Sequence, residues 1–176
     1  MTGVQTCALP IFATRHLLDA GCTDIACIAA QGGLQRQFKE RYDGYAQVVS
    51  AAGHQPWLVQ IEDGLSRDEQ GRRAVAALIA SGRKFDAVFA VCDEIALGAL
   101  RALSEAGVRV PQDAALIGFD GIRASAQAMP PLSTIEPDFQ AAGAMLVDKL
   151  LAGIAGEPHD ECRVPVRLVA RASTAR

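Results

Sequence analysis

Short apolar runs along this chain alternate with segments in which apolar residues recur every three or four positions. A continuous run of four to six apolar residues is typical of a strand that is buried on both faces. The wider spacing is typical of a helix with one buried face. The pattern predicts strands at residues 25–30, 57–61, 87–91 and 114–119.

Helical spacing fills the intervals between these strands. It predicts the end of a helix at residues 13–20, and further helices that carry Phe38 and Tyr45, begin near Asp68, and begin at Asp93. Strands that alternate with helices in this way form a parallel sheet covered on both sides. The sequence therefore predicts an α/β fold, a Rossmann-like parallel sheet with helices on both faces.

The segment after Pro130-Pro131 is predicted to differ from the rest. A helix is expected from Phe139 to about residue 152, followed by a β-like stretch at 163–169. The apolar stripe of this helix comprises Phe139, Gly143, Leu146 and Leu150. We expect the stripe to be exposed, which favours self-association.

Composition narrows the class of protein. The 176 residues carry a net charge of −3 and half of them are hydrophobic, so nothing predicts a basic nucleic-acid surface. No run approaches the roughly 18–20 apolar residues that cross a bilayer. The five cysteines are odd in number, irregularly spaced and form no CxxC pair, which favours reduced thiols in a cytoplasmic protein without a metal site. They are Cys7, Cys22, Cys27, Cys92 and Cys162.

Residues 1–11 (MTGVQTCALPI) look like translated read-through of a sequencing adapter. They have no basic stretch of the kind that begins a secretory signal. We therefore expect them to be extraneous, and the true reading frame to begin upstream of Phe12.

Two charged residues are the strongest candidates for ligand contacts. Asp120 follows an apolar strand, and polar groups at such strand ends face the ligand in open α/β sheets. The alternative for Asp120 is a capping role in the turn with Gly121. Arg41 lies near the start of a predicted helix, where its guanidinium could bind two ligand oxygens. The alternative for Arg41 is a solvated side chain in the charged stretch 39–41.

Other residues at the same predicted edge are weaker candidates. Cys92 ends the apolar run at 87–91 and could line a pocket, whereas Asp93 is expected to cap the following helix. Ser66 follows the strand at 57–61, and Trp57 is expected in the core. The sequence has no GxSxG, phosphate-loop or GxGxxG motif, so neither an enzyme nor a bound cofactor is predicted.

Several segments together resemble the effector-binding core of the LacI/GalR family of bacterial transcriptional regulators. The resemblance covers about residues 12–174. It is carried by HLLDAGCTDIACI (16–28), RYDGY (41–45), CDEIALGAL (92–100), GVRVPQDAALIGFDG (107–121), PPLSTI (130–135) and LVARAST (168–174).

This resemblance implies a type I periplasmic-binding-protein-like sensor with two lobes and the ligand between them. Residues 12–135 would be most of the C-terminal lobe, 136–160 a crossover helix of the other lobe, and 161–176 a return strand and tail. The family also implies a homodimer that binds operator DNA through an N-terminal helix-turn-helix, which these 176 residues do not contain.

The resemblance also assigns roles to single residues. Arg41 and Asp120 match the family's ligand-binding arginine and aspartate, Gln35 and Gln37 fall in its variable ligand loop, and Ser66 and Cys92 stand at further pocket positions. Leu97, Arg101 and Met129 are candidates for the dimer interface. These matches imply a small, carbohydrate-like effector of open identity. The alternative is a periplasmic sugar-binding protein of a transporter, which has the same fold.

Overall fold

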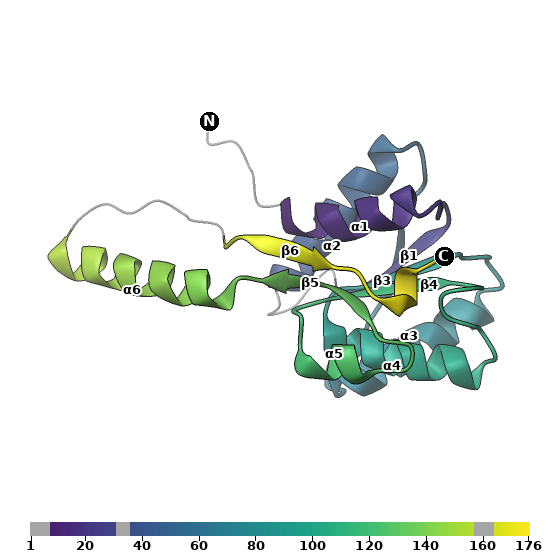
Figure 1. The fold of residues 1–176 in the computed structure, drawn as a ribbon. Coiled ribbons are helices and arrows are strands. Elements are labelled where there is room, and N and C mark those ends of the chain that lie inside the picture. Colours follow the sequence, from purple (N-terminus) through teal and green to yellow (C-terminus); the bar gives the residue numbers. More distant parts are fainter. Residues whose placement is uncertain (1–7, 31–35, 157–163) are drawn as a thin grey trace.

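A six-stranded sheet with helices on both faces forms the body of the molecule in the computed structural model, which describes residues 8–30, 36–156 and 164–176 (Figure 1). The strand order is β2-β1-β3-β4-β5-β6. The first five strands are parallel, and β6 runs antiparallel to β5. The strands are β1 (Ile25–Ala29), β2 (Trp57–Gln60), β3 (Ala87–Ala90), β4 (Ala115–Phe119), β5 (Ser133–Pro137) and β6 (Val166–Val169).

The helices lie in two layers, one on each side of the sheet. Helices α1 and α2 cover one face, and α3, α4 and α5 cover the other (Figure 1). The bounds are α1 (Ala8–Asp19), α2 (Arg36–Ala51), α3 (Arg67–Ala80), α4 (Asp93–Glu105), α5 (Arg123–Gln127), α6 (Phe139–Ala155) and the 3-10 helix η1 (Ala172–Thr174). The predicted α/β architecture is confirmed, with one antiparallel strand added at the edge.

Three elements were not predicted from the hydrophobic pattern: strand β5, helix α5 and the 3-10 helix η1. Strand β5 begins with two polar residues, Ser133 and Thr134, which are both buried and therefore interrupt the apolar signal of a strand. Helix α5 has five residues, too few for an apolar repeat to be recognised in the sequence. The predicted boundary at residue 135 falls inside β5, and the boundary at residue 11 falls inside α1.

The core lies around the central strands. Every residue of β1, β3 and β4 is buried, which is the burial expected of parallel strands between two helical layers. Phe89 of β3 is aligned with Cys27 of β1 on one side and with Ile117 of β4 on the other. The candidate functional site lies at the carboxyl ends of these buried central strands.

Helices α3 and α4 pack at unusually short range because glycines face the neighbouring backbone. A Cβ atom added at Gly98 would lie 2.0 Å from the carbonyl oxygen of Asp68. We expect Gly98→Ala to lower the free energy of unfolding by about 1–3 kcal/mol through overpacking. Chemical denaturation measures this change. Gly143→Ala on α6 is the matched control, because no atom lies within 4 Å of its added Cβ and alanine favours a helix.

The C-terminal segment is tied to the body of the molecule by a chain of hydrogen bonds. His16 Nε2 lies 2.7 Å from Thr174 Oγ1, which lies 2.8 Å from Ser133 Oγ. Ser173 donates to the carbonyl of Leu116 at 2.6 Å. Burial lowers the pKa of the His16 imidazole below its ordinary value, against the opposing charge of Asp19.

This lowered pKa predicts a loss of stability in mild acid. Below a pH of about 6.5 an unfolded histidine takes up a proton before the folded one does, so protonation favours the unfolded state. The free energy of unfolding should therefore fall as the pH is lowered from about 7.5 to about 5.5. The comparison is with His16→Gln, whose smaller pH slope isolates the contribution of this imidazole. Equal slopes would contradict the assignment.

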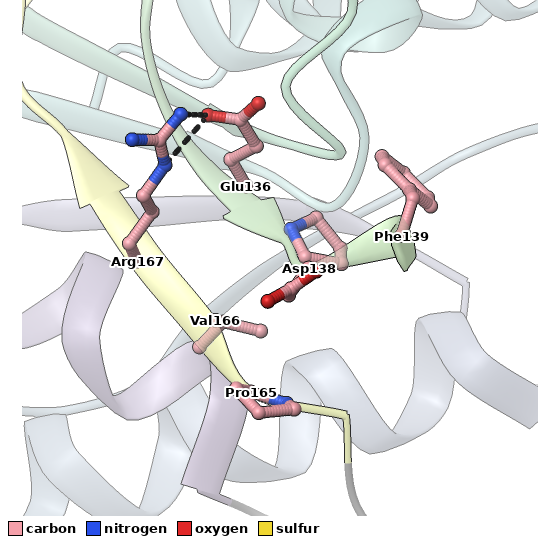
Figure 2. Close-up of a pocket in the computed structure, with 7 residues that line it drawn as sticks. Glu136, Asp138, Phe139, Pro165, Val166 and Arg167 are labelled. Carbon is pink, nitrogen blue, oxygen red and sulfur yellow. Dashed lines mark hydrogen bonds and ion pairs between the residues drawn. The ribbon is translucent and has the colours of Figure 1, made fainter. Parts of the chain in front are cut away.

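Helix α6 projects away from the sheet (Figure 1). No residue of this helix is buried, and Leu146, Leu150 and Ile154 are 71%, 63% and 75% exposed. The expected exposed apolar stripe is therefore confirmed. Where α6 leaves the sheet, the structure has a hollow lined by Glu136, Asp138, Phe139, Pro165, Val166 and Arg167, in which Glu136 pairs with Arg167 at 2.7 Å (Figure 2).

Self-association of the isolated chain through α6 stays a prediction. We expect sedimentation analysis to show concentration-dependent oligomers, because water disfavours so large an apolar face. The double variant Leu146→Glu/Leu150→Glu should shift the distribution toward the monomer. A wild-type chain that stays monomeric at high concentration would contradict this expectation.

Candidate functional site

The site lies where the strand order changes direction. The chain passes from β1 outward to β2 and then returns to β3 on the other side of β1. In open α/β sheets, this change leaves a crevice at the carboxyl ends of the two strands, and ligands bind there. Arg41 reaches this edge from α2, while Cys92 and Asp120 follow the ends of β3 and β4.

Arg41 and Asp120, 79 residues apart in sequence, form an ion pair at this edge. Arg41 Nη2 donates to Asp120 Oδ1 at 2.9 Å, and Nη1 donates to the carbonyl of Val91 at 2.5 Å. The guanidinium carbon lies 3.7 Å from the centre of the Phe119 ring. The side chain of Arg41 is only 17% exposed and that of Asp120 is 34% exposed. Arg41 is therefore not a solvated surface arginine.

The backbone at Asp120 adopts an uncommon conformation. Its φ is +113°, which side chains other than glycine rarely adopt, and its N–H donates to the carbonyl of Ile135 at 2.8 Å. Strained residues of this kind persist where their surroundings fix them, and they concentrate at functional sites. Burial raises the pKa of the Asp120 carboxyl, while the positive charge of Arg41 counteracts part of that effect.

Each residue of the Gly118-Phe119-Asp120 segment now has a physical role. A Cβ atom at Gly118 would lie 2.2 Å from Asp93 Oδ1, so only glycine leaves room for that carboxylate. Phe119, 1% exposed, supplies the ring beneath Arg41. Asp120 supplies the paired carboxylate. The segment is therefore built around two acidic side chains rather than one.

The prediction that Asp93 caps its own helix is wrong. Cys92 occupies the N-cap position of α4, and Asp93 is the first helical residue. The buried Asp93 carboxylate instead accepts three hydrogen bonds from other elements. The donors are Ile122 N–H at 2.9 Å, Ser125 Oγ at 2.7 Å and Thr134 Oγ1 at 2.7 Å. A buried carboxylate needs such donors, and these partners lie outside its own helix.

Cys92 lies beside the ion pair as a buried thiol. Burial raises its pKa to about 11, with the charge of Asp120 acting in the same direction and those of Arg67 and Arg41 opposing it. The thiol is therefore protonated at neutral pH and forms a small, weakly polar wall. Cys22 and Cys27 are also buried free thiols, whereas Cys7 and Cys162 lie outside the described residues.

The other predicted pocket residues are placed less centrally. Gln37 is exposed in the first turn of α2, one turn before Arg41, and Gln35 lies outside the described part of the chain. Ser66 caps α3 by accepting a hydrogen bond from Glu69 N–H at 3.3 Å, so its hydroxyl has a structural role. Trp57 packs partly buried against the core, as expected.

Arg67 was missed in the sequence. Its guanidinium carbon lies 4.6 Å from the centre of the Phe38 ring, and it donates to Gln70 Oε1 at 2.8 Å. The positive charge of Arg67 lowers the pKa of the Cys92 thiol, against the larger effect of burial, so a second cation lies near the site. The available signal was its position next to Ser66, at the start of a helix that follows a strand end.

The three candidates for a dimer interface lie together on the outer face. Leu97 and Arg101 from α4 and Met129, which follows α5, line one groove. Met129 is 89% exposed, and Arg101 also pairs with Asp68 at 3.3 Å. The structure thus joins residues that the sequence separates into two segments.

Similarity to known proteins extends over nearly the whole chain. The family model described as a periplasmic binding protein-like domain matches residues 14–174. The chain belongs to this family. It is 37% identical over 153 residues to the HTH-type transcriptional repressor PurR of Glaesserella parasuis, covering 85% of this chain and 43% of that protein. It is 32% identical over 164 residues to the ribose operon repressor of Halalkalibacterium halodurans, covering 92% of this chain and 48% of that protein.

A solved structure of the lac repressor dimer bound to operator and the anti-inducer ONPF superposes with a TM-score of 0.87 at 28% identity. The match covers 97% of this chain and 51% of that one. These similarities confirm the predicted membership in the effector-binding domains of LacI/GalR regulators. The chain spans less than half the length of the two curated relatives.

Among the described residues, no three His, Cys, Asp or Glu side chains are grouped so that they could hold a metal ion. Within the same residues, no helix has the length and apolar character needed to cross a membrane.

Proposed function

We propose that this chain is the effector-sensing part of a LacI/GalR-type transcriptional regulator, with Arg41 and Asp120 as the central effector-binding pair. The observation that carries this proposal is their ion pair at the switch point of the sheet. An arginine offers only donors and a carboxylate only acceptors, so together they suit a ligand with several hydroxyl or amide groups. The similarity to repressors supports this role over the transporter alternative and suggests that the chain is not an enzyme.

A small carbohydrate is the proposed effector class. Ribose is one candidate, because one relative is named a ribose operon repressor. By the family resemblance, Ser66 stands near a position that often carries a stacking aromatic, and it offers no ring to a pyranose. Either a residue outside this chain supplies the ring or the ligand is not a typical pyranose. Gln35, Gln37 and Cys92 are proposed as secondary contacts that adjust the choice of ligand.

The regulator mechanism that we propose involves parts outside this chain. An effector bound between two lobes would stabilise their closed arrangement, and that change would alter operator binding by a helix-turn-helix at the N-terminal end. The exposed face of α6 and the hollow in Figure 2 would contact the second lobe. The groove at Leu97, Arg101 and Met129 would contact a second copy in a cytoplasmic homodimer.

Sequencing the gene upstream of codon 12 tests this proposal directly. We expect an in-frame helix-turn-helix segment followed by the first lobe of the sensor. A secretory signal peptide in that position would support the transporter alternative instead. Thermal-shift screening of the complete protein against pentoses and hexoses would then identify the effector class, because a ligand that binds only the folded state raises the melting temperature.

A further inference from the structure

Asp93 is a buried carboxylate that does not line the groove at Leu97, Arg101 and Met129, yet it is hydrogen-bonded to the turn after Asp120 and to helix α5. Its Oδ2 accepts from Ile122 N–H and Ser125 Oγ, and its Oδ1 accepts from Thr134 Oγ1. These partners belong to two separate stretches of chain, the start of α5 and strand β5. A carboxylate is seldom fully buried unless such bonds compensate for its desolvation, and here the same bonds hold neighbouring segments in place.

Asp93 fixes the turn that follows Asp120 through both of its carboxylate oxygens. Ile122 N–H binds Asp93 directly, and Gly121 N–H donates to Thr134 Oγ1 at 3.2 Å, whose hydroxyl in turn donates to Asp93. Both residues after Asp120 are therefore attached to the same carboxylate. This attachment sustains the uncommon backbone at Asp120 and presents its side chain to Arg41.

The same carboxylate oxygen that binds Ile122 N–H also fixes helix α5. Ser125 is the buried residue of that short helix, and its carbonyl accepts from Leu132 N–H at 2.8 Å. The opposite side of the same helix, at Ala124 and Gln127, lines the groove together with Met129. Asp93 also begins α4, which supplies the facing wall of the groove. The carboxylate thus joins both walls of the groove to the turn at Asp120.

We propose that Asp93 is a positioning residue that holds Asp120 against Arg41 and couples that pair to the groove between α4 and α5. A change at the Arg41–Asp120 pair would move the turn at Gly121 and Ile122. Because Ile122 and Ser125 share Asp93 Oδ2, α5 would move with the turn. What this link means for effector binding and dimerisation rests on the proposed function. The coupling between the two regions can be measured without an effector or a dimer.

Methionine methyl resonances measure this coupling in the whole chain. The sequence has three methionines, of which Met129 lies in the groove and Met145 lies on the distant α6. In protein labelled with 13C at the methionine methyls, Asp120→Asn is the perturbation, because it removes the charge that pairs with Arg41. We expect the Met129 signal to shift by more than its line width and the Met145 signal to stay in place.

The role of Asp93 is tested by repeating that comparison in two backgrounds. In Asp93→Ala the response of Met129 to Asp120→Asn should disappear. In Asp93→Asn it should return, because the amide oxygen still accepts from Ile122 N–H and the NH2 group can donate to Thr134. A Met129 signal that ignores Asp120→Asn in the wild-type background, or responds equally in Asp93→Ala, would overturn the proposal.

Two milder variants keep the test decisive if Asp93→Ala does not fold. Ser125→Ala and Thr134→Val each remove one hydrogen bond to the carboxylate, and each should reduce the Met129 response. A full response in both would also overturn the proposal. No effector enters any of these measurements, so a failed search for the ligand leaves this result intact, and absence of coupling leaves the proposed function standing.

Discussion

Replacing Phe119 with alanine is expected to lower the free energy of unfolding by about 3–5 kcal/mol, because the ring is a fully buried part of the core at the end of β4. The same change removes the surface beneath the Arg41 guanidinium, 3.7 Å away. Chemical denaturation followed by circular dichroism measures the loss. Few single substitutions in this chain should cost more.

Phe119→Leu is the matched control, since it fills most of the volume but offers no aromatic face. We expect it to lose much less stability than Phe119→Ala while still loosening Arg41, because only the ring supplies the cation–π contact. Similar losses for the two variants would show that the aromatic ring, rather than buried volume, dominates. An alanine variant as stable as wild type would contradict the described packing.

Asp120→Asn in the complete regulator is expected to weaken effector binding about 10- to 150-fold, the effect of losing one hydrogen bond to a charged group at about 1.5–3 kcal/mol. Asparagine is chosen because it tolerates a positive φ better than alanine does. Arg41→Met, which keeps an apolar chain over Phe119 but removes the donors, should weaken binding to a similar degree. Isothermal titration with the effector found by screening measures both.

Arg109→Met is the control for this prediction. It removes an exposed arginine that pairs with Asp113 at 2.6 Å before β4 begins, at the opposite edge of the sheet from Asp120, and it should leave effector affinity within about twofold. If Arg109→Met weakens binding as much as Arg41→Met does, the effect of the Arg41 variant is not specific to the site. If the Asp120 and Arg41 variants bind normally, the pair has only a structural role.

The hydrophobic pattern predicted the centre of the fold well because the central parallel strands are buried on both faces. Strands β1, β3 and β4 consist entirely of buried residues, so they stand out as continuous apolar runs. Strand β5 does not stand out in this way, because its first two residues, Ser133 and Thr134, are polar. Their burial is compensated by hydrogen bonds to residues about 40 positions away in sequence. A local pattern contains no information about such distant partners.

The candidate site, like the fold, could be predicted from the sequence only where the signal is local. A polar residue after an apolar run indicated the sheet edge, but the partner of Asp120 lies 79 residues away, and only the family resemblance joined the two. Asp93 was misread because an aspartate before a helix usually caps it, whereas its real partners lie 29 to 41 residues downstream. Gly118 carried the missed signal, since a glycine inside a buried strand marks the close approach of another group.

The most direct test of the effector site is a titration of the 15N-labelled chain with ribose and other pentoses, followed by amide chemical shifts. Even weak binding by this chain would report its location. The account predicts shifts centred on Arg41, Cys92 and Asp120, all of which vanish in Asp120→Asn. Shifts centred instead on the hollow at Glu136, Asp138 and Arg167, unchanged in that variant, would contradict it.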